Sequence, residues 1–316
     1  MFSLMRRFKE VGVLAINRRN ADYTLRYNRR ALYPLVDDKL LTKQLAQANG
    51  IAVPELYGAI EVEGQVEHLP DIIRDRDGFV IKPAHGSGGE GILVVLGQMN
   101  DKFRKQDGRI ITLDELDHHV FRLLSGLYSL GGQPDRALIE YRVEFNPVFD
   151  SISYQGVPDI RIIVFLGVPV MSMVRLPTRM SEGKANLHQG AIGAGIDIAT
   201  GRTLAAVWGN EPVEQHPDTG RGLTGVQIPD WERLLELAAR CHQLTGLGYQ
   251  GVDIVLDKDK GPLVLELNAR PGLNIQIANK AGLLPRLRKV EAEHEALKST
   301  AERVAYAREQ FAASAA

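Results

Sequence analysis

Hydrophobic and polar residues alternate in two short runs near the C-terminal end of the chain, within residues 249–272. In the first run an aliphatic residue occupies every second position from Val252 to Leu256, and in the second a leucine recurs at every second position of 263–267. A charged turn that ends in Gly261 separates the two runs. This pattern predicts a β-hairpin, in which residues two apart share one face.

Three oxygen-bearing side chains lie on this predicted hairpin. Glu266 and Asn268 share a face, and antiparallel pairing can place Asp253 opposite them. Carboxylates gathered in a buried place are unfavourable unless a cation neutralises them, and oxygen-only ligands suit Mg²⁺ or Mn²⁺. The pattern therefore predicts a divalent-cation site. The alternative is a surface hairpin with a solvated acidic face.

A glycine-rich loop lies between two predicted strands in the first third of the chain. The strand before it carries Lys82, the loop spans residues 85–91, and an Ile/Val-rich strand follows at 92–96. The letters of the loop match the dinucleotide-binding pattern G-x-G-x-x-G, but that motif requires a helix where this chain has a strand. A strand–loop–strand unit of this kind predicts a flexible flap whose backbone N–H groups could cover phosphates.

Other patterns fill in the remaining elements. Leucines at helical spacing after Asp38 predict a helix that ends at Gly50, and solvent exposure is the default for its lysines, Lys39 and Lys43. Residues 97–137 look like an insertion that contains a helix. The remaining expected elements are a strand at 137–143, a hairpin at 158–175 with Arg161 and Arg175 on its two arms, a polar loop at 181–192, a helix at 231–245 and an amphipathic helix at 283–311.

Composition narrows the class of protein. Hydrophobic residues make up 44% of the 316 and charged residues 24%, which is typical of a globular chain. A net charge of −1 gives no reason to expect nucleic acid as a partner, and a single cysteine excludes an intrachain disulfide. No signal peptide and no apolar run near the ~20 residues of a membrane span are present, so we expect a cytoplasmic protein.

The N-terminal segment carries an excess of positive charge. Residues 1–33 contain eight Lys or Arg against two Asp or Glu, together with Tyr23, Tyr27 and Tyr33. The segment could dock peripherally on a membrane, on an acidic protein or on an anionic substrate. The pattern favours the alternative of a solvated helical face with aromatic packing residues.

Several stretches together resemble the ATP-grasp carboxylate–amine ligases, and most of all the RimK-type glutamate ligases. They are GVDIVLDKDKGPLVLELNARPG, KANLHQGA, FVIKPAHGSGGEGI and the triplet Asp159-Ile-Arg161. The resemblance covers roughly residues 37–282 and implies an α+β ATP-grasp fold, in which two α+β subdomains clasp ATP. The expected organisation is a basic helical segment at 1–36, subdomains at 37–140 and 141–282, and a C-terminal helix at 283–316.

The resemblance also implies which residues bind the nucleotide. Lys39 and Lys82 would hold its phosphates, with Lys82 also near the adenine edge, and Glu140 would bind the ribose hydroxyls. The flap residues expected to fold over the β- and γ-phosphates are Gly86, Ser87, Gly88, Gly89 and Gly91.

The chemistry implied by the resemblance is ATP-dependent ligation. Asp253, Glu266 and Asn268 would hold Mg²⁺ (or Mn²⁺), which agrees with the hairpin pattern. The candidate catalytic residues are Arg161, Arg175, Asn186 and His188, with Arg175 on the transferred phosphoryl group and the last two lining the amino-acid or acyl side.

The expected reaction joins a small-molecule or peptide carboxylate to an amine, the acid being an amino acid such as glutamate, with release of ADP and phosphate. An acyl phosphate is the expected intermediate, because a free carboxylate is a poor electrophile. The alternatives are a non-catalytic ATP-binding module that serves a partner enzyme and an ATP-grasp kinase. The C-terminal helix could pack back on the domain or mediate homo-oligomer formation.

Overall fold

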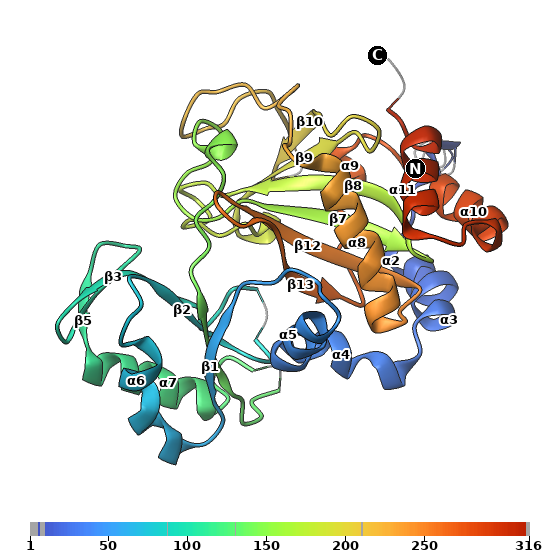
Figure 1. Ribbon diagram of the computed structural model, residues 1–316. Coiled ribbons are helices and arrows are strands. Elements are labelled where there is room, and N and C mark those ends of the chain that lie inside the picture. Colours follow the sequence, from blue (N-terminus) through green and yellow to red (C-terminus); the bar gives the residue numbers. More distant parts are fainter. Residues whose placement is uncertain (1–5, 7–9, 87, 130, 210, 314–316) are drawn as a thin grey trace. The chain divides into compact units, whose positions relative to one another are not determined.

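The protein forms two compact units, each built around an antiparallel sheet. The computed structural model (Figure 1) describes residue 6 and residues 10–313 except 87, 130 and 210. The small unit comprises Asp37–Gln47 and Val53–Val143, and the large unit comprises Met1–Val36, Ala48–Ala52 and Glu144–Ala316. The N-terminal 36 residues and the C-terminal helices thus belong to the large unit by their contacts. None of the described helices is long and apolar enough to cross a membrane.

The small unit holds a six-stranded sheet in the order β1-β6-β2-β3-β4-β5. Its strands are β1 (Leu56–Ile60), β2 (Phe79–Pro83), β3 (Leu93–Met99), β4 (Lys102–Lys105), β5 (Ile110–Thr112) and β6 (Ala137–Tyr141). Its helices are α5 (Lys39–Ala48, whose last residue falls in the large unit), the 3-10 helix η3 (Glu63–His68), α6 (Leu69–Ile73) and α7 (Leu113–Leu124). The predicted strand that carries Lys82 and the predicted helix after Asp38 are confirmed.

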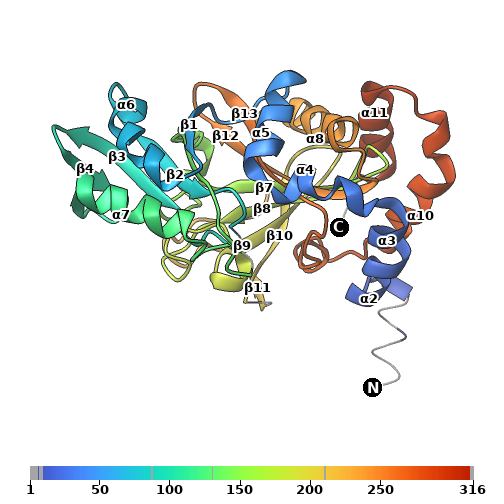
Figure 2. The ribbon, with the colours of Figure 1, turned by 90° about the horizontal axis from the view of Figure 1, so that it is seen from below.

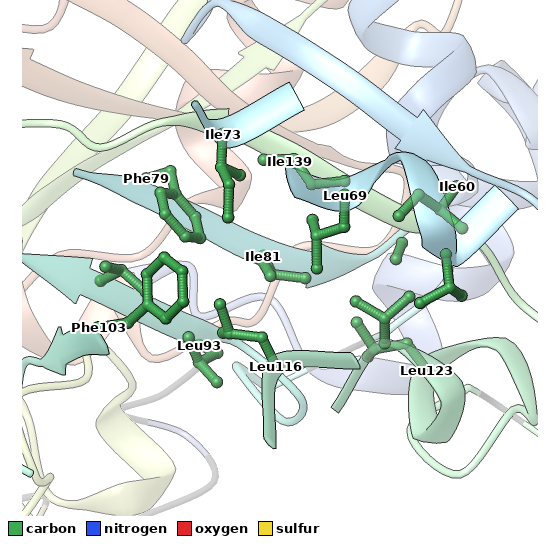
Figure 3. Close-up of a cluster of buried hydrophobic side chains, with 14 of the residues drawn as sticks. Ile60, Leu69, Ile73, Phe79, Ile81, Leu93, Phe103, Leu116, Leu123 and Ile139 are labelled. Atoms are coloured by element: carbon green, nitrogen blue, oxygen red, sulfur yellow. The ribbon is translucent and has the colours of Figure 1, made fainter. Parts of the chain in front are cut away.

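One face of this sheet is covered by α6 and α7, and the core lies between them (Figure 3). Phe79 of β2 packs edge-on against Phe103 of β4 with ring centroids 6.0 Å apart. Leu116 and Leu123, seven residues apart on α7, are both fully buried because they lie on the same helix face. The predicted insertion therefore belongs to the core, and its strands β4 and β5 extend the sheet beyond what the sequence pattern indicated.

The large unit holds a seven-stranded sheet in the order β11-β10-β9-β8-β7-β12-β13. Its strands are β7 (Asp159–Phe165), β8 (Val168–Leu176), β9 (Ile192–Ile196), β10 (Thr203–Trp208), β11 (Glu211–Val213), β12 (Tyr249–Asp257) and β13 (Gly261–Asn268). The long helix α8 (Trp231–Thr245) packs on β7, β12 and β13. Every residue of β12 is buried, because the strand has a neighbour on each side and is covered by α8.

The N-terminal segment is helical in short pieces and packs on the large unit. Its pieces are α2 (Ile16–Arg18), the π-helix η1 (Arg19–Thr24), α3 (Leu25–Tyr27), the 3-10 helix η2 (Arg30–Leu32) and α4 (Pro34–Asp37). Tyr23 packs edge-on against Phe165 at 5.5 Å, which confirms the predicted aromatic packing. The side chain of Asn28 bonds the backbone of both Tyr249 and Ala269, and so ties the segment to the open end of the β12–β13 hairpin.

The C-terminal region contains two helices where one was predicted. They are α10 (Leu284–Glu293) and α11 (Thr300–Gln310), separated by the 3-10 helix η6 (His294–Ala296). The single-helix prediction is wrong because Ser299 begins a new helix, with a capping box between its side chain and Glu302. The α11 helix packs on α8 and β8, and α10 lies beside α3 (Figure 2), where Arg26 pairs with Glu291 at 2.9 Å. The remaining short helices are η4 (Pro147–Phe149), η5 (Leu187–Gln189) and α9 (Ile275–Ala278).

Candidate active site

The predicted hairpin is confirmed, and its register brings the candidate metal ligands together. Asp253 of β12 pairs directly with Glu266 of β13, and Gly251 pairs with Asn268. The Nδ2 atom of Asn268 donates a hydrogen bond to Oδ2 of Asp253 at 3.3 Å. Asp253 is only 2% exposed, because its strand β12 lies between β7 and the edge strand β13. A solvated surface hairpin is therefore excluded.

Two arginines converge on the Asp253 carboxylate. Arg161 of β7 donates from Nε to Oδ1 at 2.7 Å and from Nη2 to Oδ2 at 2.5 Å. Arg175 of β8 donates from Nη2 to Oδ2 at 2.7 Å and forms a bidentate pair with Asp159, with both distances 2.5 Å. The sequence placed both arginines on the arms of one hairpin. The sequence did not indicate that Asp159 and Asp253 would share these arginines. They do so because β7 lies between β8 and β12 in the sheet.

The pKa values of Asp253 and Asp159 are shifted in opposite directions. Burial acts to raise the pKa of Asp253, but the guanidiniums of Arg161 and Arg175 outweigh it and lower that pKa to about 2. Burial raises the pKa of Asp159 to about 6, because the negative charge of Asp253 adds to it and Arg175 compensates only in part. Burial acts to lower the pKa of Arg175, and its two carboxylates reverse the direction. The network thus keeps Arg175 charged and fixed in place.

The side chains on the hairpin fit a divalent cation by their chemistry. The carboxylates of Asp159 and Asp253 pair with the two guanidiniums, and Glu266 and Asn268 bring a further carboxylate and an amide oxygen on β13, where Glu266 lies opposite Asp253. The candidate ligands are two carboxylates and one amide, and in the described part of the chain no three His, Cys, Asp or Glu side chains gather as a metal site. Both oxygens of Asp253 accept from arginines, so Glu266 and Asn268 would supply oxygen donors for Mg²⁺ with Asp253 behind them.

Asn186 and His188 stand apart from this network. The side chain of Asn186 accepts from the backbone N–H of His188 at 3.0 Å and caps the short helix η5. His188 is exposed. No hydrogen bond or ion pair found in the described residues joins either side chain to the arginines. Their role on the substrate side stays a prediction.

In the small unit, Lys82 and Glu140 form part of a buried cluster. The Lys82 ammonium lies 2.5 Å from Oε1 of Glu140, and the ammonium of Lys43 lies 2.7 Å from Oε2. All three side chains are at most 6% exposed. The expected exposure of Lys43 is wrong, because its helix faces the end of β6. The ribose contact of Glu140 stays a prediction, and both of its oxygens already serve lysines.

Burial and the neighbouring charges shift the pKa values of Lys43 and Glu140. Burial lowers the pKa of Lys43 to about 8, with Glu140 opposing the shift and Lys82 adding to it. Burial acts to raise the pKa of Glu140, but the two ammonium groups outweigh it and hold that pKa below its usual range. The cluster therefore presents two cations held by one carboxylate, which is a suitable arrangement for binding phosphate groups.

Lys43 gives a testable pH dependence of stability. Between its folded pKa of about 8 and its ordinary value of 10.5, the unfolded chain binds more protons than the folded one. The free energy of unfolding should therefore rise with pH in this window, and below pH 8 the contribution is constant. We expect Lys43→Met to remove this rise, which is at most about 3 kcal/mol.

Urea unfolding at two pH values, one below and one inside the window, measures the effect. Lys102→Met, which changes an exposed lysine of the same unit, is the matched control and should keep the rise. If Lys43→Met gained as much stability with pH as the unmodified protein, the assignment of the shift to Lys43 would be refuted.

The glycine-rich flap is fixed at both ends. Lys39 donates from Nζ to the carbonyl of Gly86 at 2.5 Å, and Nε2 of His119 lies 3.0 Å from the carbonyl oxygen of Gly91. Gly91 has a φ of +72°, and a Cβ there would lie 2.7 Å from the Tyr128 ring, so only glycine fits. Gly88 and Gly89 also have positive φ. Ser87 lies outside the described residues.

Comparison with protein families identifies the likeness. A family model described as sugar-transfer associated ATP-grasp matches residues 18–292. The predicted α+β ATP-grasp fold is thereby confirmed, whereas the narrower likeness to RimK-type glutamate ligases stays a prediction. No curated protein shows significant sequence similarity to the chain.

Several solved structures of ligases and synthetases align with this chain. The ATP-grasp ligase PsnB with its minimal precursor aligns at 14% identity and a TM-score of 0.46, over 84% of this chain and 64% of PsnB. D-cycloserine synthetase DcsG aligns at 16% and 0.46, over 86% and 74% of the two chains. D-alanine–D-alanine ligase from Bacillus anthracis with ATP aligns at 16% and 0.43, over 88% and 68%. All three TM-scores are below 0.5, so the family match alone carries the assignment.

Proposed function

Because this chain belongs to the sugar-transfer associated ATP-grasp family, we propose that it is an ATP-dependent ligase. It would activate a carboxylate as an acyl phosphate and join it to an amine, with release of ADP and phosphate. The observation that carries the proposal is the pair of guanidiniums held on Asp253 beside the Glu266–Asn268 edge of the hairpin. Such a site offers cations for a phosphoryl group and anionic oxygens for a metal ion.

The proposed first step is transfer of the γ-phosphoryl group to the substrate carboxylate. A carboxylate oxygen attacks phosphorus, the bond to the β-phosphate oxygen breaks, and ADP leaves. Charge on the transferring group is neutralised by the Arg175 guanidinium, which Asp159 and Asp253 hold in one orientation. Mg²⁺, held by Glu266 and Asn268 with Asp253 behind them, would supply further neutralisation of the phosphate oxygens.

In the proposed second step the amine attacks the carbonyl carbon of the acyl phosphate. The carbon–oxygen bond to phosphate breaks, the amine loses a proton, and the amide and inorganic phosphate result. Arg161 would stabilise the departing phosphate, because it shares the Asp253 carboxylate with Arg175. Asn186 and His188 are proposed to line the side from which the acid or the amine enters.

The lysine cluster of the small unit is proposed to bind the nucleotide. Lys82 and Lys43 would contact its phosphates, and Lys39 would hold the flap above them through Gly86. Glu140, at 2% exposed, is better placed to orient the two lysines than to receive a ribose. The two roles for Glu140 can be distinguished by comparing the binding of ATP with that of 2′,3′-dideoxy-ATP.

The substrates are proposed at the level of chemical class. A glutamate-like acid follows from the RimK resemblance, and the family description connects the reaction with sugar transfer. A cytoplasmic location, homo-oligomer formation and docking by the basic N-terminal segment are further proposals.

The reaction is tested by incubating the protein with ATP, Mg²⁺ and mixtures of acids and amines. We expect stoichiometric ADP and phosphate, and an amide detected by mass spectrometry. AMP and pyrophosphate would exclude the mechanism. A stable phosphorylated product without amide would indicate a kinase, and nucleotide binding without any turnover would indicate a non-catalytic module.

A further inference from the structure

A buried arginine in the N-terminal segment has no counter-ion in the described part of the chain. Arg19 opens the π-helix η1 and is 6% exposed. Its guanidinium donates to the carbonyl of Pro271 at 2.7 Å and to Oδ1 of Asn20 at 2.8 Å, and both partners are neutral. These bonds use two of the five N–H groups that a guanidinium carries. A buried guanidinium without a carboxylate is unfavourable unless an anion reaches it.

Two tyrosines near Arg19 also have polar groups without a partner in the described structure. Arg19 interacts electrostatically with Tyr249, Arg270 and Tyr33. These four residues are here called the Arg19 site. The hydroxyls of Tyr33 and Tyr249 are buried and have no hydrogen-bond partner within the described structure. Arg270 is exposed, and its guanidinium lies 5.1 Å from the centre of the Tyr33 ring. Burial lowers the pKa of Arg19, and the charge of Arg270 lowers it further.

We propose that the Arg19 site binds an oxyanion group of the substrate, a carboxylate or a phosphate. Two guanidiniums and two unpartnered hydroxyls are all donors to such a group, and a bound anion would supply the missing counter-charge. The exposed Arg270 provides the side from which the anion enters. The π-helix that carries Arg19 is a local irregularity of the kind often found at functional sites.

The position of the site connects it to the proposed chemistry. Arg19 bonds the carbonyl of Pro271, three residues after Asn268, and Arg270 lies between them. The loop that follows Asn268 would therefore contribute Arg270 to the oxyanion site. The strand before this loop is the one proposed to bind Mg²⁺. The assignment of this group to the substrate rests on the proposed function, whereas oxyanion binding itself can be measured without turnover.

The test is thermal unfolding with inorganic phosphate, carried out in saturating MgADP so that the nucleotide is present throughout. We expect phosphate to raise Tm of the unmodified protein by several degrees. Arg19→Gln and Arg270→Gln should abolish most of this rise, and Tyr249→Phe should weaken phosphate binding several-fold. Arg18→Gln, which changes the exposed neighbour that pairs with Asp22, is the matched control and should retain the rise.

The outcomes separate this inference from the proposed reaction. An equal phosphate effect in Arg19→Gln, or none in the unmodified protein, overturns the Arg19 site even if amide is formed. Loss of the effect in the site variants supports it even if no amide is found. If Arg19→Gln fails to fold, the surface variant Arg270→Gln decides. A parallel titration with acetate shows whether the site prefers carboxylate over phosphate.

Discussion

Replacing Glu266 by glutamine is expected to abolish turnover. The change keeps the size of the side chain but removes the negative charge of the carboxylate that lies opposite Asp253 in the hairpin. A neutral amide is a weaker ligand for a divalent cation than a carboxylate. Because a metal ion contributes several kcal/mol to stabilising a phosphoryl-transfer transition state, we expect kcat to fall by about 10³-fold or more, on the order of 4 kcal/mol.

The measurement is ADP release as a function of Mg²⁺ concentration, with Mn²⁺ binding followed by electron paramagnetic resonance. Glu236→Gln, which changes an exposed glutamate of α8, is the matched control and should leave both quantities unchanged. A near-normal kcat at moderate Mg²⁺ in Glu266→Gln would exclude Glu266 as a metal ligand. Loss of Mn²⁺ binding together with loss of turnover would support it.

The hairpin could be predicted from sequence because its information is local. A period of two fixes which residues share a face, and a short turn fixes which residues face one another. Asp253 and Glu266 were therefore correctly placed opposite each other. Burial was harder to predict, because it depends on α8 and on the neighbouring strand β7, which lie far away in the sequence.

The parts that escaped prediction depend on long-range pairing. Lys43 is an ordinary helix lysine by its neighbours, and only the end of β6, almost a hundred residues later, supplies the Glu140 that allows its burial. Asp159 and Arg175 lie 16 residues apart, and their contact follows from the β7–β8 register. The same rule explains Arg19, whose partner Pro271 lies 252 residues away. In each case a charged residue that looks like a surface group is buried by a distant strand or loop.

Arg175→Lys is the second change expected to have a large effect. Arg175 holds Asp159 through two parallel bonds and reaches Asp253 with a third, so its planar donors serve two carboxylates at once. A lysine keeps the charge but cannot bridge both groups. We expect kcat to fall by on the order of 10²-fold, because the cation that faces the transferring phosphoryl group loses its fixed orientation. ATP affinity should stay within a few-fold, since the proposed nucleotide ligands belong to the small unit.

The same change should also lower stability, because it leaves two buried carboxylates under-compensated, at a cost of about 3 kcal/mol. Turnover must therefore be measured well below Tm, where the variant is fully folded. Arg179→Lys, at a side chain that is 74% exposed, is the control and should alter neither kcat nor Tm. A lower Tm with normal kcat would make Arg175 a structural residue. A lower kcat with unchanged nucleotide affinity is what a residue acting on the transition state predicts, because its interaction is stronger there than in the ground state.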